Sequence, residues 1–103
     1  MPTDIDGIIE YKDKAYILIE MKHRDAKLPQ GQRIALERMV NDFSHSGKMA
    51  CVLLCSHCID NCHDSIKAEN TIVIGVYYNG KWTRSYSPLG DEIERIVRWI
   101  ETC

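Results

Sequence analysis

The spacing of hydrophobic and polar residues changes several times along this chain, and each spacing predicts a different element. Residues 7–11 (GIIEY) and 15–21 (AYILIEM) are rich in β-branched and aromatic side chains, which favours two strands. Only the polar triplet KDK separates them. We therefore predict that the two strands pair as an N-terminal β-hairpin with a three-residue loop.

The next apolar residues recur at helical intervals. After the segment LPQGQ breaks the strand pattern, apolar side chains return with the three- and four-residue spacing that predicts an amphipathic helix. They are Leu36, Met39, Val40 and Phe43. Gly47 follows them, and it suits a helix C-terminus because glycine adopts left-handed backbone conformations at little steric cost.

Three more strands and a second helix are expected in the rest of the chain. The apolar runs 49–55 (MACVLLC) and 71–78 (TIVIGVYY) predict strands. An Asn-Gly pair at 79–80 predicts a type I′ turn into the segment KWTRSY. The last segment has apolar residues at helical spacing, after a Ser-Pro pair that suits a helix start. These apolar residues are Leu89, Ile93, Ile96, Val97 and Ile100.

This order of elements, β-β-α-β-β-α with one further strand possible before the last helix, predicts an α/β (α+β) fold. We expect a mixed central sheet of about four to five strands that begins with the hairpin and is flanked by two helices. A chain of 103 residues, 45% of them apolar and 27% charged, has the size of one domain. Residues 1–103 are therefore expected to form a single unit.

Neither a membrane span nor a secretion signal is expected. No apolar run approaches the roughly 20 residues that cross a bilayer, and the N-terminal MPTDIDG lacks the basic-then-apolar order of a signal peptide. We therefore expect a cytoplasmic protein. The net charge is −2, but a local basic patch can coexist with an acidic total, and residues 22–33 contain four Lys/Arg.

The expected hairpin register brings acidic residues together. With the loop centred on Asp13, Asp6 lies opposite Glu20, with about 5 Å between the two Cβ atoms. The same register puts Asp4 opposite Lys22. A slip of one residue would turn Asp6 to the other face. Two opposed carboxylates repel each other unless a cation lies between them, and Mg²⁺ prefers such oxygen ligands.

Metal-assisted hydrolysis of a phosphodiester would use these residues. The backbone carbonyl of Met21 is a further oxygen ligand, and Lys22 can neutralise a phosphate or orient the attacking water. Gln32 lies one helical turn before Leu36, so it continues the inward stripe of the first helix and can hold a water or a phosphate oxygen. Asp4 is an alternative or auxiliary ligand.

These residues resemble the PD-(D/E)xK nuclease superfamily. The matching pieces are DIDGII, whose Asp6 precedes an apolar strand, then IEMK as the E-x-K, then GQR opening the following helix. Their order is similar to the Holliday-junction resolvase-like, VRR-NUC-like and phage-exonuclease-like branches, which carry a glutamine on that helix. The likeness covers about residues 4–43, and MACVLLC fits the next strand of the family.

The resemblance implies a restriction-endonuclease-like core and a nuclease that acts on DNA, with an endonuclease favoured over an exonuclease. It implies that Asp6 and Glu20 bind Mg²⁺ or Mn²⁺. Lys22 would then assist catalysis, and Gln32 would support the site. Cores of this family usually begin with a helix and a strand before the aspartate, whereas here only five residues precede Asp6. We therefore expect a reduced core or a fragment, with a second subunit or the C-terminal helix in the missing place, which favours a homo-oligomer.

Basic residues near Lys22 are candidates for contacts with the phosphate backbone of DNA. They are His23, Arg24, Lys27 and Arg33. A solvated loop is an equally good interpretation of these residues. On the final hairpin, Trp82, Arg84 and Tyr86 suit stacking on bases, although a core or edge-strand role is the preferred interpretation.

Cysteines form a second cluster in CVLLCSHCIDNCHD. The segment contains Cys51, Cys55, Cys58, Cys62, His57 and His63. The spacing of Cys55, Cys58 and Cys62 is compatible with zinc binding or redox chemistry, but the second half of a two-pair zinc site is absent. Cys51 and Cys55 suit buried strand positions. We interpret the cysteines as reduced and structural.

Two functions from different classes remain. The first is a metal-dependent deoxyribonuclease, which needs the set of Asp6, Glu20 and Lys22. The alternative is a catalytically silent nucleic-acid-binding or assembly module of the same fold, which does not need that set. A third and weaker candidate is a metal-binding or redox protein that uses the cysteine segment.

Overall fold

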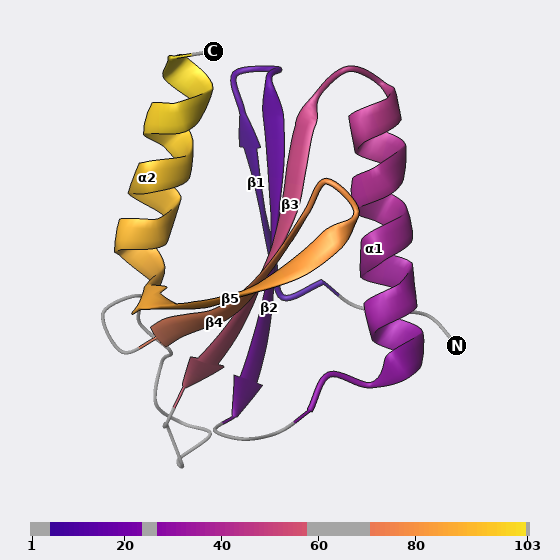
Figure 1. The fold of residues 1–103 in the computed structure, drawn as a ribbon, viewed down its shortest axis with the longest axis vertical. Helices are drawn as coiled ribbons and strands as arrows, with labels where there is room; N and C mark the ends of the chain where they lie inside the picture. Colours follow the sequence, from indigo (N-terminus) through magenta and orange to yellow (C-terminus); the bar gives the residue numbers. More distant parts are fainter. Residues whose placement is uncertain (1–4, 24–26, 58–70, 103) are drawn as a thin grey trace.

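The computed structural model describes residues 5–23, 27–57 and 71–102. Within these residues five strands form one mixed sheet in the order β1-β2-β3-β4-β5, and a helix lies on each face of it (Figure 1). The elements are β1 (Gly7–Tyr11), β2 (Ala15–His23), α1 (Gln30–His45), β3 (Met49–His57), β4 (Thr71–Tyr78), β5 (Lys81–Pro88) and α2 (Leu89–Glu101). The predicted α+β fold, with a mixed sheet that starts with a hairpin and two flanking helices, is confirmed.

The N-terminal hairpin has the predicted register. Ile8 pairs with Leu18, and Gly7 pairs with Ile19. The three-residue loop closes with a hydrogen bond of 2.8 Å from the Lys14 N–H to the Tyr11 carbonyl. Because side chains alternate between the two faces of a strand, continuing this register by one residue puts Asp6 opposite Glu20.

β2 and β3 run parallel and are joined by α1. Parallel neighbours need such a crossover connection, and Figure 1 shows α1 beginning at the end of the sheet where β2 finishes. The helix ends as expected, with Gly47 at φ 91° just after the C-terminal residue of the helix. The Asn-Gly turn at 79–80 also has the expected positive φ at both residues, 53° and 84°. β3 continues two residues past the predicted end, to His57.

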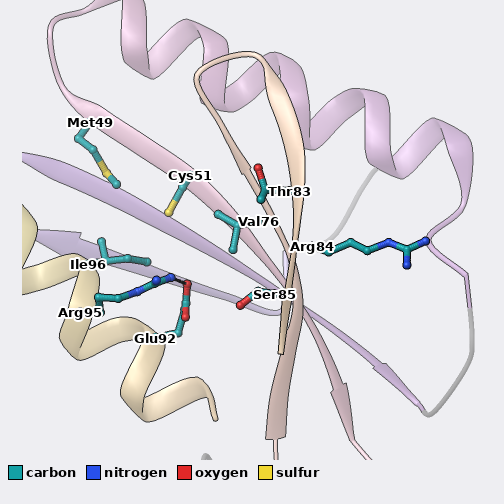
Figure 2. A pocket seen from close by; sticks show the side chains of 9 residues that line it. All are labelled: Met49, Cys51, Val76, Thr83, Arg84, Ser85, Glu92, Arg95 and Ile96. Atoms are coloured by element: carbon teal, nitrogen blue, oxygen red, sulfur yellow. Dashed lines mark hydrogen bonds and ion pairs between the residues drawn. The ribbon is translucent and has the colours of Figure 1, made fainter. Parts of the chain in front are cut away.

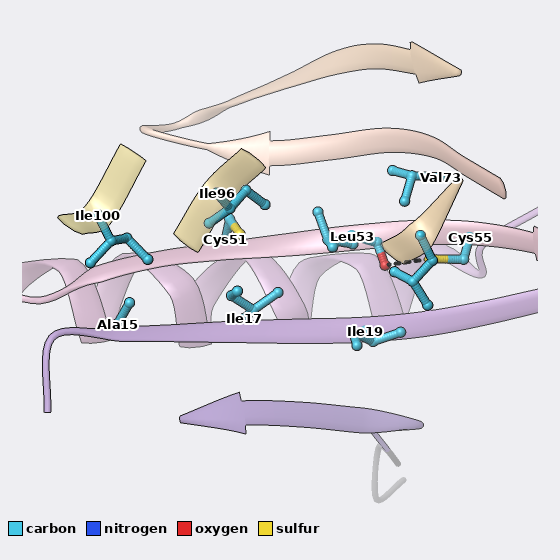
Figure 3. Close-up of a cluster of buried hydrophobic side chains, with 10 residues drawn as sticks. Ala15, Ile17, Ile19, Cys51, Leu53, Cys55, Val73, Ile96 and Ile100 are labelled. Atoms are coloured by element: carbon cyan, nitrogen blue, oxygen red, sulfur yellow. Dashed lines mark hydrogen bonds between the residues drawn. The ribbon is translucent and has the colours of Figure 1, made fainter. Parts of the chain in front are cut away.

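The sheet has a hydrophobic core on each face. The core under α1 consists of Leu18, Leu36, Val40, Ala50, Val52 and Tyr77. The core under α2, drawn in Figure 3, consists of Ala15, Ile17, Ile19, Cys51, Leu53, Cys55, Val73, Leu89, Ile96 and Ile100. Successive residues of β2 and β3 divide between the two cores because successive strand side chains point to opposite faces.

Cys51 and Cys55 are free thiols inside the second core, as expected for structural cysteines. Burial, with a smaller effect from the Glu92 carboxylate, raises the pKa of each thiol to about 12. Both therefore stay protonated near neutral pH and are poor nucleophiles. The rest of the predicted cysteine cluster, Cys58, Cys62 and His63, lies outside the described residues.

Leu36 is fully buried and fixes α1 on the sheet. We expect Leu36→Ala to lower the free energy of unfolding by about 3 kcal/mol, because the substitution leaves a cavity without reducing helix propensity. Urea unfolding measures this change. Arg38→Ala on the exposed side of the same helix is the control and should change it by less than about 0.5 kcal/mol. Equal effects of the two substitutions would contradict this packing.

The length and apolar content of a helix decide whether it can cross a membrane. Neither α1 nor α2 has the length and apolar content that crossing a membrane requires.

Candidate metal and nucleic-acid site

A carboxylate is buried near the end of β2, where the apolar part of the strand stops. Glu20 is only 2% exposed and lies on the α1 face, two residues beyond the core residue Leu18. Lys22 follows on the same face and is half-buried. A buried charge is costly unless it is paired or binds a metal, so the neighbours of Glu20 decide its role.

Gln32 and Lys22 both contact the same oxygen of Glu20. The Gln32 Nε2 donates a hydrogen bond of 2.5 Å to Glu20 Oε1, and the Lys22 Nζ lies 3.3 Å from that oxygen. Lys22 also donates to Gln32 Oε1 at 3.2 Å. Gln32 reaches this position because it is in the first turn of α1, one turn before the buried Leu36. The three side chains therefore form one closed group, which we call the Glu20 cluster.

Asp6 lies at the edge of this cluster and is exposed. Its Oδ2 accepts a hydrogen bond of 2.7 Å from the backbone N–H of Met21. Because the N–H and C=O of one strand residue point to the same side of the strand, the Met21 carbonyl faces the same edge as Asp6. The structure thus brings Asp6, Glu20 and the Met21 carbonyl to one place, while Asp4 lies outside the described residues.

The second oxygen of Glu20 has no hydrogen-bond partner in the part of the chain that the structure describes. Glu20 Oε2 is fully buried and makes no hydrogen bond within the described residues, although buried polar atoms are nearly always satisfied. Burial raises the pKa of the Glu20 carboxyl, and the nearby Asp6 raises it further, whereas Lys22 and Gln32 lower it. A cation is the group that would satisfy this oxygen and remove the repulsion with Asp6.

The donor set fits Mg²⁺ or Mn²⁺ better than zinc. Among the residues that the structure describes, no group of three or more His, Cys, Asp or Glu side chains is placed to hold a metal ion. Mg²⁺ does not need such a group, because it is commonly held by one or two carboxylates and completes its shell with water and substrate phosphate. Two carboxylates and a carbonyl at the edge of the sheet match that mode.

The raised pKa of Glu20 gives a pH dependence of defined sign. The pKa of the Glu20 carboxyl in the folded protein lies above its ordinary value of 4.5, so the protonated carboxyl stabilises the fold relative to the ionised one. Without metal, this stabilisation is fully present below pH 4.5 and is lost as the pH rises through the raised pKa. A cation needs the ionised form, so Mn²⁺ affinity should rise with pH through the same range and protons should be released on binding. Calorimetric Mn²⁺ titrations between about pH 5 and 8 test this. Affinity independent of pH would exclude Glu20 as a ligand.

The predicted phosphate-contacting residues differ in their surroundings. His23 is exposed, and its ring lies 5.3 Å from that of His57. Lys27 is exposed just before α1. Arg33 pairs with Glu37, with 3.6 Å between the Arg33 Nε and Glu37 Oε2. Arg24 lies outside the described residues. His23, Lys27 and Arg33, the members of the set that the structure describes, are thus all exposed, and Arg33 is already paired with a glutamate.

Trp82 has the structural role that was the preferred interpretation. Its ring lies 5.3 Å from that of Tyr77, and its Nε1 donates a hydrogen bond of 2.6 Å to Glu37. Glu37 therefore joins Trp82 and Arg33, and the final hairpin is tied to α1 through it.

Glu92 was not among the functional residues predicted from the sequence. This carboxylate is 3% exposed on α2, accepts a hydrogen bond of 2.6 Å from the Ser87 hydroxyl and pairs with Arg95. It borders a cavity of about 280 Å³ next to Cys51 (Figure 2). Its burial could have been predicted, since Glu92 lies three residues after Leu89 on the apolar stripe of the helix. Both of its oxygens have partners, so its role is structural.

Comparison with protein-family models, curated proteins and solved structures gives no match for this chain.

Proposed function

We propose that this protein is a metal-dependent nuclease that hydrolyses phosphodiester bonds of DNA. The observation that carries the proposal is the Glu20 cluster. It contains a buried carboxylate with one oxygen that has no hydrogen-bond partner among the described residues, and this carboxylate contacts a lysine and a glutamine. A structural carboxylate would have both oxygens satisfied, as Glu92 does.

The residues that would hold Mg²⁺ or Mn²⁺ are Asp6, Glu20 and the Met21 carbonyl. When bound, such an ion supplies Lewis-acid stabilisation of the charge that develops on the phosphate and lowers the pKa of water in its shell. Asp6 Oδ2 is held by the Met21 N–H, which fixes the position of this carboxylate. The protein thereby fixes the ligand geometry before the substrate arrives.

Lys22 supplies the positive charge of the Glu20 cluster. Its ammonium group is half-buried, which strengthens its interaction with a phosphate compared with a fully exposed lysine. Gln32 accepts a hydrogen bond from Lys22 and donates one to Glu20. It therefore orients both side chains.

The likeness to the PD-(D/E)xK superfamily supports the proposal from the sequence, independently of the geometry. The order of Asp6, the E-x-K of Glu20 and Lys22, and the helix glutamine Gln32 is the family's order. Those residues also converge here from the position just before β1, from β2 and from α1. The predicted homo-oligomer stays a prediction, to be tested by light scattering after size-exclusion chromatography.

A panel of linear, nicked, branched and single-stranded DNA tests the proposal. We expect cleavage of at least one member with Mg²⁺ or Mn²⁺, no cleavage in EDTA, and none by Asp6→Ala. A wild-type protein that binds DNA and leaves the entire panel intact would instead be the silent binding module. Equal cleavage by Asp6→Ala would remove Asp6 from the site.

A further inference from the structure

A row of residues crosses the α1 face of the sheet from the Glu20 cluster to the opposite edge. The strand registers give the row Glu20, Leu54, Gly75 and Arg84. Each of these residues lies two positions along its strand from an apolar residue of the α1-face cluster, so all four share that face. Three strand spacings of about 4.8 Å put the Cα atoms of Glu20 and Arg84 about 14 Å apart.

Arg84 is an exposed cation without an acidic partner among the described residues. Three other arginines in the described residues, Arg33, Arg95 and Arg98, pair with glutamates. Within the same residues Arg84 forms no ion pair or hydrogen bond. Figure 2 shows its side chain extending away from Glu92 and from α2. Its guanidinium is thus available for an anion on the α1 side.

Tyr86 lies two residues further along the same edge and is 88% exposed. Its neighbours Ser85 and Ser87 contact each other, and Ser87 bonds Glu92 on the α2 side. Tyr86 therefore points to the α1 side, as Arg84 does. An exposed ring beside a cation is the combination with which proteins bind single strands, through base stacking and phosphate contact.

We propose that Arg84 and Tyr86 form a second contact for the DNA strand that is cut at the Glu20 cluster. Arg84 binds a phosphate, and Tyr86 stacks on a base. With about 14 Å between the two Cα atoms, the contact lies a few nucleotides from the scissile phosphate. This inference rests on the proposed function and adds a second point of contact for the substrate at the far edge of the sheet.

Fluorescence anisotropy with labelled single-stranded DNA in EDTA, at salt concentrations between about 0.05 and 0.2 M, tests the phosphate contact. We expect Arg84→Ala to weaken affinity by about tenfold and to reduce the salt-dependence slope by about 1. Arg84→Lys should restore the slope because it keeps the charge. Lys81→Ala, with the same charge change on the same strand but on the α2 face, should match the wild type.

The stacking contact has a different signature. Tyr86→Ala should weaken affinity by about tenfold with an unchanged salt slope, and Tyr86→Phe should keep wild-type affinity. At saturating DNA both alanine variants should cleave at the wild-type rate, with the loss confined to KM. Wild-type DNA affinity in Arg84→Ala would overturn the phosphate contact, and wild-type affinity in Tyr86→Ala would overturn the stacking contact. If the wild-type protein still cleaves DNA in that case, the proposed function stands. A wild-type protein that neither binds nor cuts DNA overturns both.

Discussion

Glu20→Gln should abolish Mn²⁺ binding and make the metal-free protein more stable. The substitution keeps the shape of the side chain and an oxygen for Lys22, but it removes a buried charge that Asp6 repels. We expect the free energy of unfolding to rise by about 1 kcal/mol without metal. Cleavage should fall by about a thousandfold or more, because the cation contributes several kcal/mol to transition-state stabilisation.

Urea unfolding with and without Mn²⁺ measures both effects of Glu20→Gln. At about 100 times its dissociation constant, Mn²⁺ should stabilise the wild type by about 2.7 kcal/mol and the variant by nothing. Glu10→Gln is the matched control, since Glu10 is exposed on β1 and its carboxylate only accepts a bond from the Asp13 N–H. It should retain the full stabilisation by Mn²⁺. A similar gain in Glu20→Gln would place the cation elsewhere.

Lys22→Ala should separate catalysis from metal binding. Lys22 contacts Glu20 and Gln32 but is not a ligand, so Mn²⁺ affinity should survive near pH 8 while the cleavage rate falls by about 10²- to 10³-fold. Lys22 lowers the pKa of Glu20. Its removal should therefore move the pH range in which Mn²⁺ affinity rises to higher pH.

Single-turnover cleavage and Mn²⁺ titration at two pH values test the Lys22 prediction. Lys14→Ala is the control, because Lys14 is an exposed lysine at the far end of the same hairpin. It should show wild-type rate and affinity. A Lys22→Ala protein with wild-type rate and wild-type affinity would remove Lys22 from the mechanism, and one that loses Mn²⁺ affinity at every pH would make the lysine a structural support of the ligands.

Local patterns predicted most of the fold. The KDK triplet fixed the hairpin register, and the alternation of Ile17, Leu18 and Ile19 divided the strand between two cores. The position of Gln32 one turn before Leu36 was enough to expect it near Glu20, because helical spacing determines which side chains face the sheet. These features depend on neighbours in the sequence, and short-range sterics determine them.

Features that depend on distant partners were not predicted. The unpartnered oxygen of Glu20 follows from how closely α1 packs on β2. The hydrogen bond from Trp82 to Glu37 joins the final hairpin to a helix 45 residues earlier in the chain. The register shift between Val73 and Gly75 changes which residues of β5 share a face with Glu20. No local spacing carries this information.

The most direct test of the nuclease is the rate of cleavage by wild type, Glu20→Gln and Glu10→Gln on the same DNA panel in Mn²⁺. The account predicts cleavage by the wild type and by Glu10→Gln at equal rates, and none by Glu20→Gln. A wild-type protein that binds Mn²⁺ through Glu20 and cuts no member of the panel would contradict it, as would a Glu20→Gln protein that cuts at the wild-type rate.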